Sequence, residues 1–482
     1  MKKRKRLDST TDKHLASAGS AEDRPEGPSL SKKAPLDSAR EFVRRNYTSG
    51  DDRLLHSIRG ELLKWSGCGY VETSTEAMKS ELYRFLDGAT EGGTDHGFRP
   101  FKPTQRDVAN VIDALKAECF IDLAPPTWIE EPDEPPADRL IVGRNGWIDP
   151  LASTLVIHAP TPRLLTTSPL DFEIDVEAQE PLTWLTFLES LQLQDDALRL
   201  LQEFFGYALT SDTSQQKALM IIGPKRSGKG TILRVLTRLV GPYNTCSPTL
   251  GSLAGNFGLS PLLDKRLATI GDARLSGRTD QAIVTERLLS VIGEDGVTVD
   301  RKHREPVTGK LGVRFAIATN ELPRLSDASG ALSGRMLMLP LREQFYGRED
   351  VSLSERLIAD LPGILMWALD GLRRLRDRGK FVQPASGCEM QQEMDDLGSP
   401  VSAFVRERCD VESGLSVECD TLFEAWRIWC RGQGRENAGT KANFGRELRP
   451  VVPGLKRTQP RTDVGRLGHY EGIDLKISSE VP

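Results

Sequence analysis

Residues 221–236, IIGPKRSGKGTILRVL, have the order of an apolar strand, a glycine-rich turn, a lysine and the start of a helix. Gly223 to Lys229 match the pattern G-x-x-x-x-G-K of a phosphate-binding loop. Backbone N–H groups in such a turn bind phosphate oxygens, the following helix presents its positive end to the same anion, and the lysine adds a charge for the β- and γ-phosphates. KALMII before the turn is typical of a buried strand, and TILRVLTRLVGP after it has helical spacing with a Gly-Pro stop. We therefore predict nucleotide contacts from Gly223, Pro224, Lys225, Arg226, Ser227, Gly228, Lys229, Gly230 and Thr231.

The hydroxyl residue of this loop is displaced by one position. Gly230 follows the lysine, where a Mg²⁺-binding Ser or Thr usually stands, and the hydroxyl comes next at Thr231. The phosphate-binding loop of nucleoside monophosphate kinases also contains the sequence GKGT, so a phosphotransferase function stays open as an alternative to ATP hydrolysis. Those kinases are short chains with the loop near the N-terminus, whereas the loop here starts only at Gly223, which counts against that alternative without excluding it.

Two further apolar strands each lead to a polar side chain. The strand expected at 267–270 leads to Asp272, and the strand expected at 313–319 ends in Asn320. A carboxylate at such a strand end can hold Mg²⁺ through water, and a polar side chain there can contact the γ-phosphate. A second acid often stands beside the carboxylate to orient the attacking water, but that neighbour is Gly271. We predict ATP and Mg²⁺ as cofactors, with Thr231 and Asp272 at the metal.

The order of these motifs resembles the superfamily 3 helicases. In SGRMLMLPL, Arg335 precedes another apolar strand, where an arginine can act as a finger in a neighbouring subunit's site. In viral initiator helicases of that superfamily, the interval before the Asn-ending strand carries a β-hairpin with a Lys-His pair that grips single-stranded DNA. Here GEDGVTVDRKHREPVTGK places Lys302 and His303 there, with Arg301 and Arg304 alongside. The resemblance implies an active site shared between subunits. One subunit supplies Lys229, Thr231, Asp272 and Asn320, and the next supplies Arg335.

The best overall match is the phage and plasmid primase–helicase family, which includes the poxvirus-type helicases. FFGYALTSD, TNELPRLSDASGALSGRMLMLPLREQFYG and ERLIADLPGILMWALDGLRRLRDRGKF are typical of it. The resemblance covers roughly 54–475 and is most specific from Phe204 to Phe381. It implies a hexameric ring that moves 3′ to 5′ on DNA during replication of a phage, plasmid or integrated element. The chain before Leu54 is too short for the polymerising primase domain of many members, so we expect no priming activity, and a separate primase stays open as a partner.

The bulk composition fits a soluble, globular protein. Of the 482 residues, 38% are hydrophobic and 28% charged, and the net charge is -5. No window approaches the ~20 apolar residues that span a bilayer, so no membrane partner is expected. The basic start, MKKRKR, is not followed by an apolar core, so a secretory signal is not expected. The seven cysteines include no C-x-x-C pair, which disfavours zinc or disulfide frameworks and favours a cytoplasmic location.

We predict an α/β protein with an AAA+-type P-loop ATPase core between two smaller modules. Residues 1–41 lack aromatic residues and are expected to form a disordered basic and polar tail. The family resemblance implies a helicase-associated N-terminal domain at 42–170, mostly helical with a small β element, and a helicase ATPase domain at 216–385. A helical connector at 171–215 joins them, and a C-terminal module follows at 395–482.

The C-terminal pattern of three helices and a basic hairpin indicates a winged helix that binds duplex DNA. Residues 431–470 contain nine Lys or Arg residues against three acids, a difference of +6 in a chain that is -5 overall. A non-enzymatic DNA-binding initiator with a decayed ATPase stays open, and Gly271 is the residue that favours it. The predicted DNA contacts are Arg301, Lys302, His303, Lys456, Arg457, Arg461 and Arg466.

Overall fold

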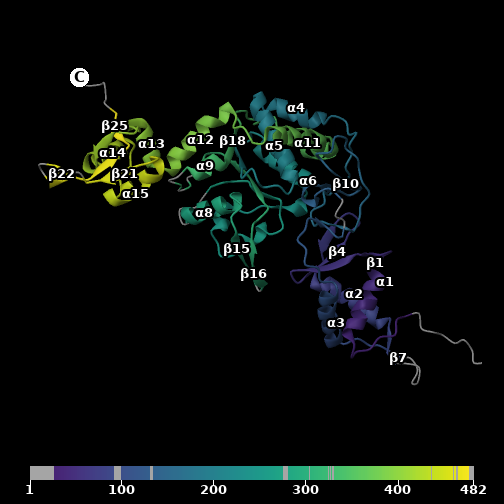
Figure 1. The fold of residues 1–482 in the computed structure, drawn as a ribbon. Helices are drawn as coiled ribbons and strands as arrows, with labels where there is room; N and C mark the ends of the chain where they lie inside the picture. The colour runs from purple at the N-terminus through teal and green to yellow at the C-terminus, as the bar shows by residue number, and fades with distance from the viewer. Residues whose placement is uncertain are drawn as a thin grey trace, which may run out of the picture. The chain divides into compact units, whose positions relative to one another are not determined.

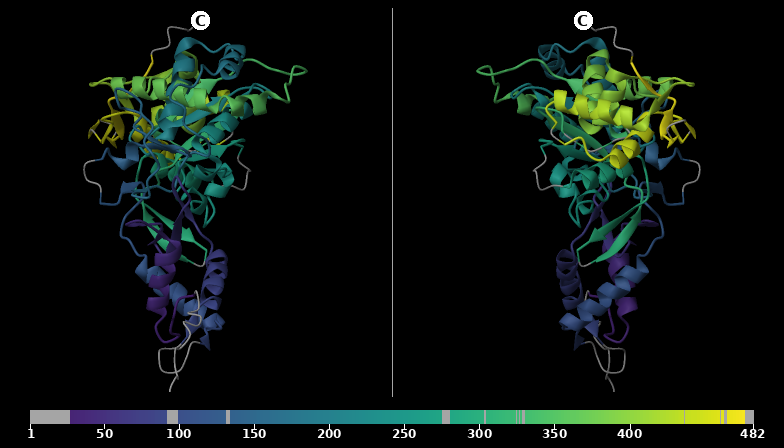
Figure 2. Two further views of the ribbon diagram at one scale, coloured as in Figure 1. Left: turned by 90° about the vertical axis from the view of Figure 1, so that its right-hand side faces the viewer. Right: turned by 90° about the vertical axis from the view of Figure 1, so that its left-hand side faces the viewer.

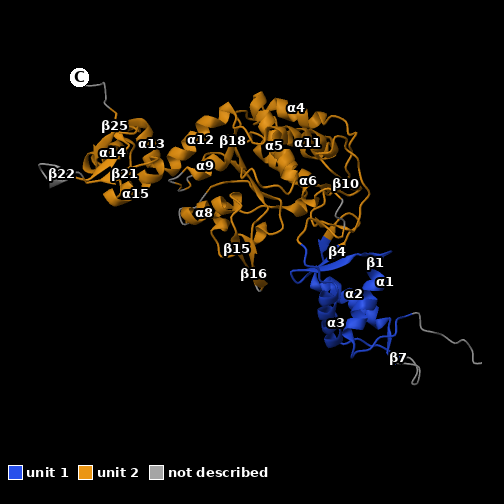
Figure 3. Ribbon diagram, viewed as in Figure 1, with its two compact units in different colours: residues 1–64, 71–123 blue, residues 65–70, 124–482 orange. Residues whose placement is uncertain are grey.

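The computed structural model divides the chain into two compact units, one made of residues 1–64 and 71–123 and the other of 65–70 and 124–482 (Figure 3). The residues it describes are 27–91, 99–130, 134–274, 280–302, 304–323, 325, 327, 330–435, 437–459, 461–462, and 465–476. Of 461–462 and 465–466 it describes the backbone.

The first unit packs three helices against short strands. Phe42, Met78, Leu82 and Leu115 are fully buried in its core. Thr104 caps the third helix, because its side chain accepts the Asp107 N–H while the Asp107 carboxylate accepts the Thr104 N–H. The elements are α1 (Pro35–Asn46), β1 (Thr48–Ser49), β2 (Asp52–Arg53), β3 (Leu55–Ile58), β4 (Glu61–Trp65), β5 (Tyr70–Glu72), α2 (Thr75–Asp87), β6 (Thr90–Glu91), β7 (Arg99–Pro100) and α3 (Gln105–Glu118).

A five-stranded parallel sheet forms the centre of the second unit, in the order β13-β14-β17-β12-β18. This confirms the expected α/β class. The strand predicted at 267–270 is observed there, and the one predicted at 313–319 begins at Arg314. The strands are β12 (Ala218–Ile222), β13 (Thr245–Cys246), β14 (Leu267–Ile270), β17 (Arg314–Thr319) and β18 (Met336–Pro340).

Helices cover both faces of this sheet (Figure 1). Alternate residues of β12 face opposite ways, so Leu219 and Ile221 belong to one core with α5, α6 and α11, while Met220 and Ile222 belong to another with α7 and α8. Both faces are therefore buried, as is usual for parallel sheets. The helices are α4 (Leu182–Ser190), α5 (Asp195–Leu209), α6 (Lys229–Val240), α7 (Leu250–Leu253), α8 (Gln281–Ile292), α9 (Ala331–Arg335), α10 (Leu353–Ala359), α11 (Leu361–Arg378) and α12 (Ala385–Gly398).

A β-hairpin projects from the sheet, visible as a pair of long strands in both views of Figure 2. It consists of β15 (Val297–Arg301) and β16 (Arg304–Gly309), and it follows α8 directly in the chain. Most of its side chains are exposed or half-buried, and Val299 alone among the described hairpin residues is buried. Smaller elements complete this part of the unit: β8 (Thr127–Trp128), η1 (Ala137–Arg139), β9 (Ile141–Gly143), β10 (Gly146–Ile148), β11 (Leu164–Leu165), η2 (Pro242–Asn244) and η3 (Ser260–Leu262).

The last part of the chain contains three helices and a three-stranded antiparallel sheet, β20-β24-β21. Its core contains Phe404, Trp426, Trp429 and Phe444. The elements are α13 (Pro400–Arg408), β19 (Cys409–Asp410), β20 (Ser416–Glu418), α14 (Cys419–Gly432), α15 (Lys441–Val451), β21 (Lys456–Thr458), β22 (Arg461–Thr462), β23 (Gly465–Arg466), β24 (His469–Glu471) and β25 (Asp474–Leu475).

The structure groups some residues differently from the sequence analysis. Helix α1 begins at Pro35, inside the segment 1–41 expected to be a tail, because Ala39 and Phe42 pack into the core of the first unit. Residues 124–170 belong to the second unit, whereas the sequence grouped 42–170 together. Across the described parts of the chain, no helix combines the length and apolar character needed to cross a membrane.

Candidate functional site

The glycine-rich loop joins the carboxyl end of β12 to the first residue of α6, Lys229. Arg226 and Gly228 have φ values of 61° and 89°, so the chain reverses tightly before the helix begins. Gly223 has no room for a side chain, because an added Cβ would lie 2.6 Å from the Leu341 carbonyl oxygen. A tight turn of this kind directs successive backbone N–H groups toward one point, which makes a concave site for anions.

The Lys229 ammonium lies inside this loop and reaches the next strand. Its Nζ donates to the carbonyl oxygens of Gly223 at 2.7 Å and Pro224 at 2.6 Å, and it contacts Ser227 Oγ at 3.2 Å. It also donates to Asn320 Oδ1 at 3.1 Å. Burial lowers the pKa of this lysine from its ordinary value. Two residues that the sequence singled out separately therefore meet at the carboxyl edge of the sheet.

Asp272 follows β14, the strand beside β17 on the side away from β12. Its carboxylate accepts from Arg274 Nε at 3.0 Å on each oxygen and pairs with Arg274 Nη2 at 2.9 Å. This hydrogen bonding lowers the pKa of Asp272. The Arg274 guanidinium is also attracted by Glu321, which sequence analysis did not select although it follows Asn320 directly. The carboxylate is ionised and accessible, but a metal ion would have to displace Arg274 from it.

The two glycines that depart from the usual motifs are both open to solvent. An added Cβ at Gly230 or at Gly271 would meet no atom within 4 Å. Neither glycine is therefore required by packing. Thr231, the displaced hydroxyl residue, is half-buried on the wall of the adjoining cavities.

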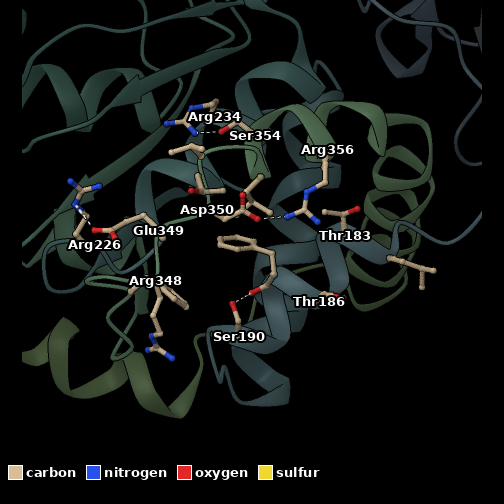
Figure 4. Close-up of a pocket in the computed structure, with 17 residues that line it drawn as sticks. Thr183, Thr186, Ser190, Arg226, Arg234, Arg348, Glu349, Asp350, Ser354 and Arg356 are labelled. Carbon is tan, nitrogen blue, oxygen red and sulfur yellow. Dashed lines mark hydrogen bonds and ion pairs between the residues drawn. The ribbon is translucent and has the colours of Figure 1, made fainter.

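Two adjoining cavities open beside the glycine-rich loop. The smaller, of about 460 Å³, is lined by residues 225–231, Arg234, Asn320 and Tyr346. The larger, of about 770 Å³, lies between α4, α6 and the segment after β18, and shares with the smaller Arg226, Gly228, Thr231 and Arg234. Figure 4 shows the larger cavity, with Arg226 directed at Glu349.

The segment after β18 is attached to the glycine-rich loop. Phe345 N–H donates to the Arg226 carbonyl oxygen at 2.9 Å, and Arg226 Nε lies 3.7 Å from Glu349 Oε1. Phe345 lines the larger cavity together with Phe187 of α4. Sequence analysis missed these aromatic residues, because their spacing in the chain gives no sign that they face one cavity.

Arg335 lies at the amino end of the parallel strands, opposite the carboxyl end where the glycine-rich loop lies. It precedes β18, whose Met336 pairs with Ala218 at the start of β12, while the glycine-rich loop follows the end of β12. The five residues of strand β12 place these two ends roughly 15 Å apart. Arg335 Nη1 donates to the Leu289 carbonyl oxygen at 2.5 Å. The structure therefore does not bring Arg335 to the loop of its own chain.

Lys217 stands beside Arg335 and was also missed by the sequence analysis. Its ammonium donates to the Gly334 carbonyl oxygen. Burial and the nearby Arg335 charge lower the pKa of Lys217. Its position directly before a buried strand was the available signal.

The predicted DNA contacts lie in two separate places. Arg301 ends β15 with its Nε donating to the Glu305 carbonyl oxygen at 2.9 Å, and Lys302 is exposed at the hairpin tip. His303 lies outside the described residues. Lys456 and Arg457 are exposed on β21. Arg461 and Arg466 lie in β22 and β23, and their side chains lie outside the described part.

Comparison with known proteins gives a family match over residues 221–335, to a family described as "Family of unknown function (DUF5906)". That family has no assigned function. The match spans the glycine-rich loop, Asp272, Asn320 and Arg335, but less than half of the chain.

A curated relative, the uncharacterized mitochondrial protein ymf21 of Marchantia polymorpha, is 33% identical over 79 residues, or 16% of this chain and 44% of that protein. The chain thus spans less than half of that relative's length. Among solved structures, two apo structures of the NrS-1 C-terminal region resemble it at 11% and 12% identity. Their TM-scores are 0.47 and 0.48, over 91% and 92% of this chain and 99% and 100% of theirs.

Proposed function

We propose that the chain is an ATP-driven DNA helicase of the superfamily 3 type that acts in the replication of a phage, plasmid or integrated element. The observation that carries the proposal is the contact of Lys229 Nζ with Asn320 Oδ1 at the carboxyl edge of a parallel sheet. It joins the candidate phosphate-binding loop to the polar residue expected at the γ-phosphate. Asp272 follows the neighbouring strand β14 of the same sheet.

The residues at this edge fit a nucleoside triphosphate with Mg²⁺. The smaller cavity is lined by the loop and by Lys229, so it suits the phosphates, and the larger adjoining cavity has the volume and aromatic walls that suit a nucleoside. Thr231 and Asp272 offer hydroxyl and carboxylate oxygens, the ligand type that Mg²⁺ prefers. When bound there, Mg²⁺ would neutralise charge on the phosphates.

The chain's own residues would divide the work between neighbouring subunits. Lys229 would neutralise the terminal phosphates, and Asn320 would orient both this lysine and the attacking water. Since Arg335 lies at the amino end of the strands, away from the glycine-rich loop of its own chain, it could reach only the nucleotide phosphate bound by a neighbouring copy. A ring of identical subunits, with hexamer as the expected size, would supply that neighbour.

Two elements would contact DNA. The exposed hairpin β15–β16 would hold single-stranded DNA in the ring through Arg301, Lys302 and His303. The C-terminal module would act as a winged helix on duplex DNA. Exposed Arg446 and Arg449 on α15 and exposed Lys456 and Arg457 on β21 support this role, because none of the four pairs with a described carboxylate.

A second candidate is an ATP-gated DNA-binding initiator that does not hydrolyse the nucleotide. The bidentate pairing of Asp272 with Arg274 favours it, as does the absence of a second acid at Gly271. The phosphotransferase alternative provides no role for the projecting hairpin.

The test is phosphate release from ATP with and without single-stranded oligothymidylate, together with strand displacement from a partial duplex. The helicase proposal expects turnover that DNA stimulates and displacement that requires ATP. ATP binding without turnover would favour the initiator. Phosphate transfer to a nucleoside monophosphate, without stimulation by DNA, would favour the phosphotransferase.

A further inference from the structure

The Arg335 guanidinium lies on the last turn of α8. Besides the 2.5 Å bond from Nη1 to the Leu289 carbonyl oxygen, it lies directly against Gly293, where an added Cβ would be 2.6 Å from Nη1 and 2.9 Å from Nη2. Gly293 N–H donates to the same Leu289 oxygen at 2.8 Å. We call residues 289–293 the arginine-binding turn. Only a glycine at 293 leaves room for the guanidinium there.

The arginine-binding turn continues directly into the projecting hairpin. Three residues, Glu294, Asp295 and Gly296, separate it from β15. Two side chains from the segment before β12 hold the junction: Gln216 Nε2 donates to the Gly293 carbonyl oxygen at 3.1 Å, and Thr213 Oγ1 donates to the Glu294 carboxylate. A displacement of the hairpin base therefore reaches the turn, and through it the guanidinium.

A neutral carbonyl oxygen, that of Leu289, accepts the hydrogen bond of this cation. The carbonyl end of a helix carries only a partial negative charge, so it attracts a cation more weakly than a full negative charge does. Within the described residues, neither Arg335 nor Lys217 beside it forms an ion pair with a carboxylate. A phosphate accepts two charge-assisted hydrogen bonds from a guanidinium, which are stronger than a bond to a carbonyl. The guanidinium can thus leave the turn for a phosphate.

We propose that the arginine-binding turn is the resting position of Arg335 and links it to the hairpin, with Gly293 as the positioning residue. The inference rests on the proposed function, in which Arg335 acts on the nucleotide of a neighbouring subunit. The guanidinium binds either the Leu289 carbonyl oxygen or that phosphate. While the guanidinium binds the Leu289 carbonyl oxygen, it cannot bind the phosphate. Movement of a hairpin that holds DNA displaces the arginine-binding turn and so decides whether Arg335 is free to bind the phosphate.

The first test replaces Gly293 by alanine, so that the new Cβ occupies the place of the guanidinium while Arg335 is unchanged. Gly296→Ala is the matched control, since its Cβ would meet no atom within 4 Å in the same junction. We expect G293A to keep the KM for ATP within about twofold and to lose stimulation by oligothymidylate, its ratio of turnover with and without DNA falling to nearly one. G296A should keep the parental ratio. A G293A protein with the parental ratio would overturn the inference.

The second test needs no substitution. Hydrogen exchange is compared in the parental protein with and without a non-hydrolysable ATP analogue. Release of Arg335 predicts faster exchange in peptides covering 286–296, together with slower exchange over 223–231 where the nucleotide binds. Protection at 223–231 with no change at 286–296 would refute the link alone. No protection at 223–231 would instead refute nucleotide binding, and with it the proposed function.

Discussion

Replacement of Lys229 by alanine tests the nucleotide site most directly. An ammonium 4 Å from a phosphate charge is worth about 4 kcal/mol at an effective dielectric constant of 20. The ammonium must give up part of its contacts with Gly223, Pro224, Ser227 and Asn320, and a hydrogen bond to a charged group is worth about 1.5–3 kcal/mol. The net loss of ATP-binding free energy in Lys229→Ala is therefore about 2 kcal/mol, which corresponds to roughly 30-fold weaker ATP binding.

The assay is calorimetric titration with Mg²⁺ and ATP, followed by phosphate release at saturating ATP. We expect Lys229→Ala to show the weaker affinity and no measurable turnover. Its free energy of unfolding should change by less than about 1 kcal/mol, because the residue begins α6 and alanine favours helix. Lys225→Ala is the control, since Lys225 is exposed in the same loop and would contribute through its backbone. Parental affinity or turnover in Lys229→Ala would refute the site assignment.

Four further predictions concern other parts of the chain. Arg335→Ala should keep ATP affinity and lose about 10³-fold in turnover; mixed with the lysine variant it should exceed the sum of the two activities, and a strictly linear dependence on mixing ratio would contradict the shared site. Lys302→Ala combined with His303→Ala should keep basal turnover and oligomeric state but lose DNA stimulation; parental unwinding rates would exclude the hairpin as the DNA contact. Gly271→Asp should fold, because its Cβ meets open space, and should raise phosphate release at least about tenfold; unchanged release would show that another group orients the water. Burial lowers the pKa of His56 to about 4 from 6.5, so between pH 6.5 and 4 the unfolded chain binds a proton at His56 that the folded chain does not. The free energy of unfolding of the first unit should therefore fall by up to about 3 kcal/mol as pH falls from 6.5 to 4. Hydrogen exchange of β3 should become faster over this range, and an identical pH profile in His56→Gln would show that His56 is not the cause.

The positions of Lys229 and Asn320 illustrate what local sequence can predict. Lys229 closes the glycine-rich loop that follows β12, and Asn320 follows β17 directly, while the carboxyl ends of parallel strands lie on the same side of a sheet. Motif spacing therefore predicted that both would face one site, and the observed contact at 3.1 Å agrees. Arg274 and Glu321 could not be found this way, because their importance depends on which strands are neighbours.

The sequence by itself determined the glycine-rich loop and the continuous apolar runs of the strands around it, which are buried on both faces of the sheet, because these follow from residue types at short spacing. Only the tertiary structure decided that the Phe345 segment attaches to the loop, that Lys217 stands beside Arg335, and that the arginine rests on the turn before the hairpin. The physical reason is that such contacts join residues dozens to more than a hundred positions apart. Strand order and helix packing bring them together, and no local pattern encodes either.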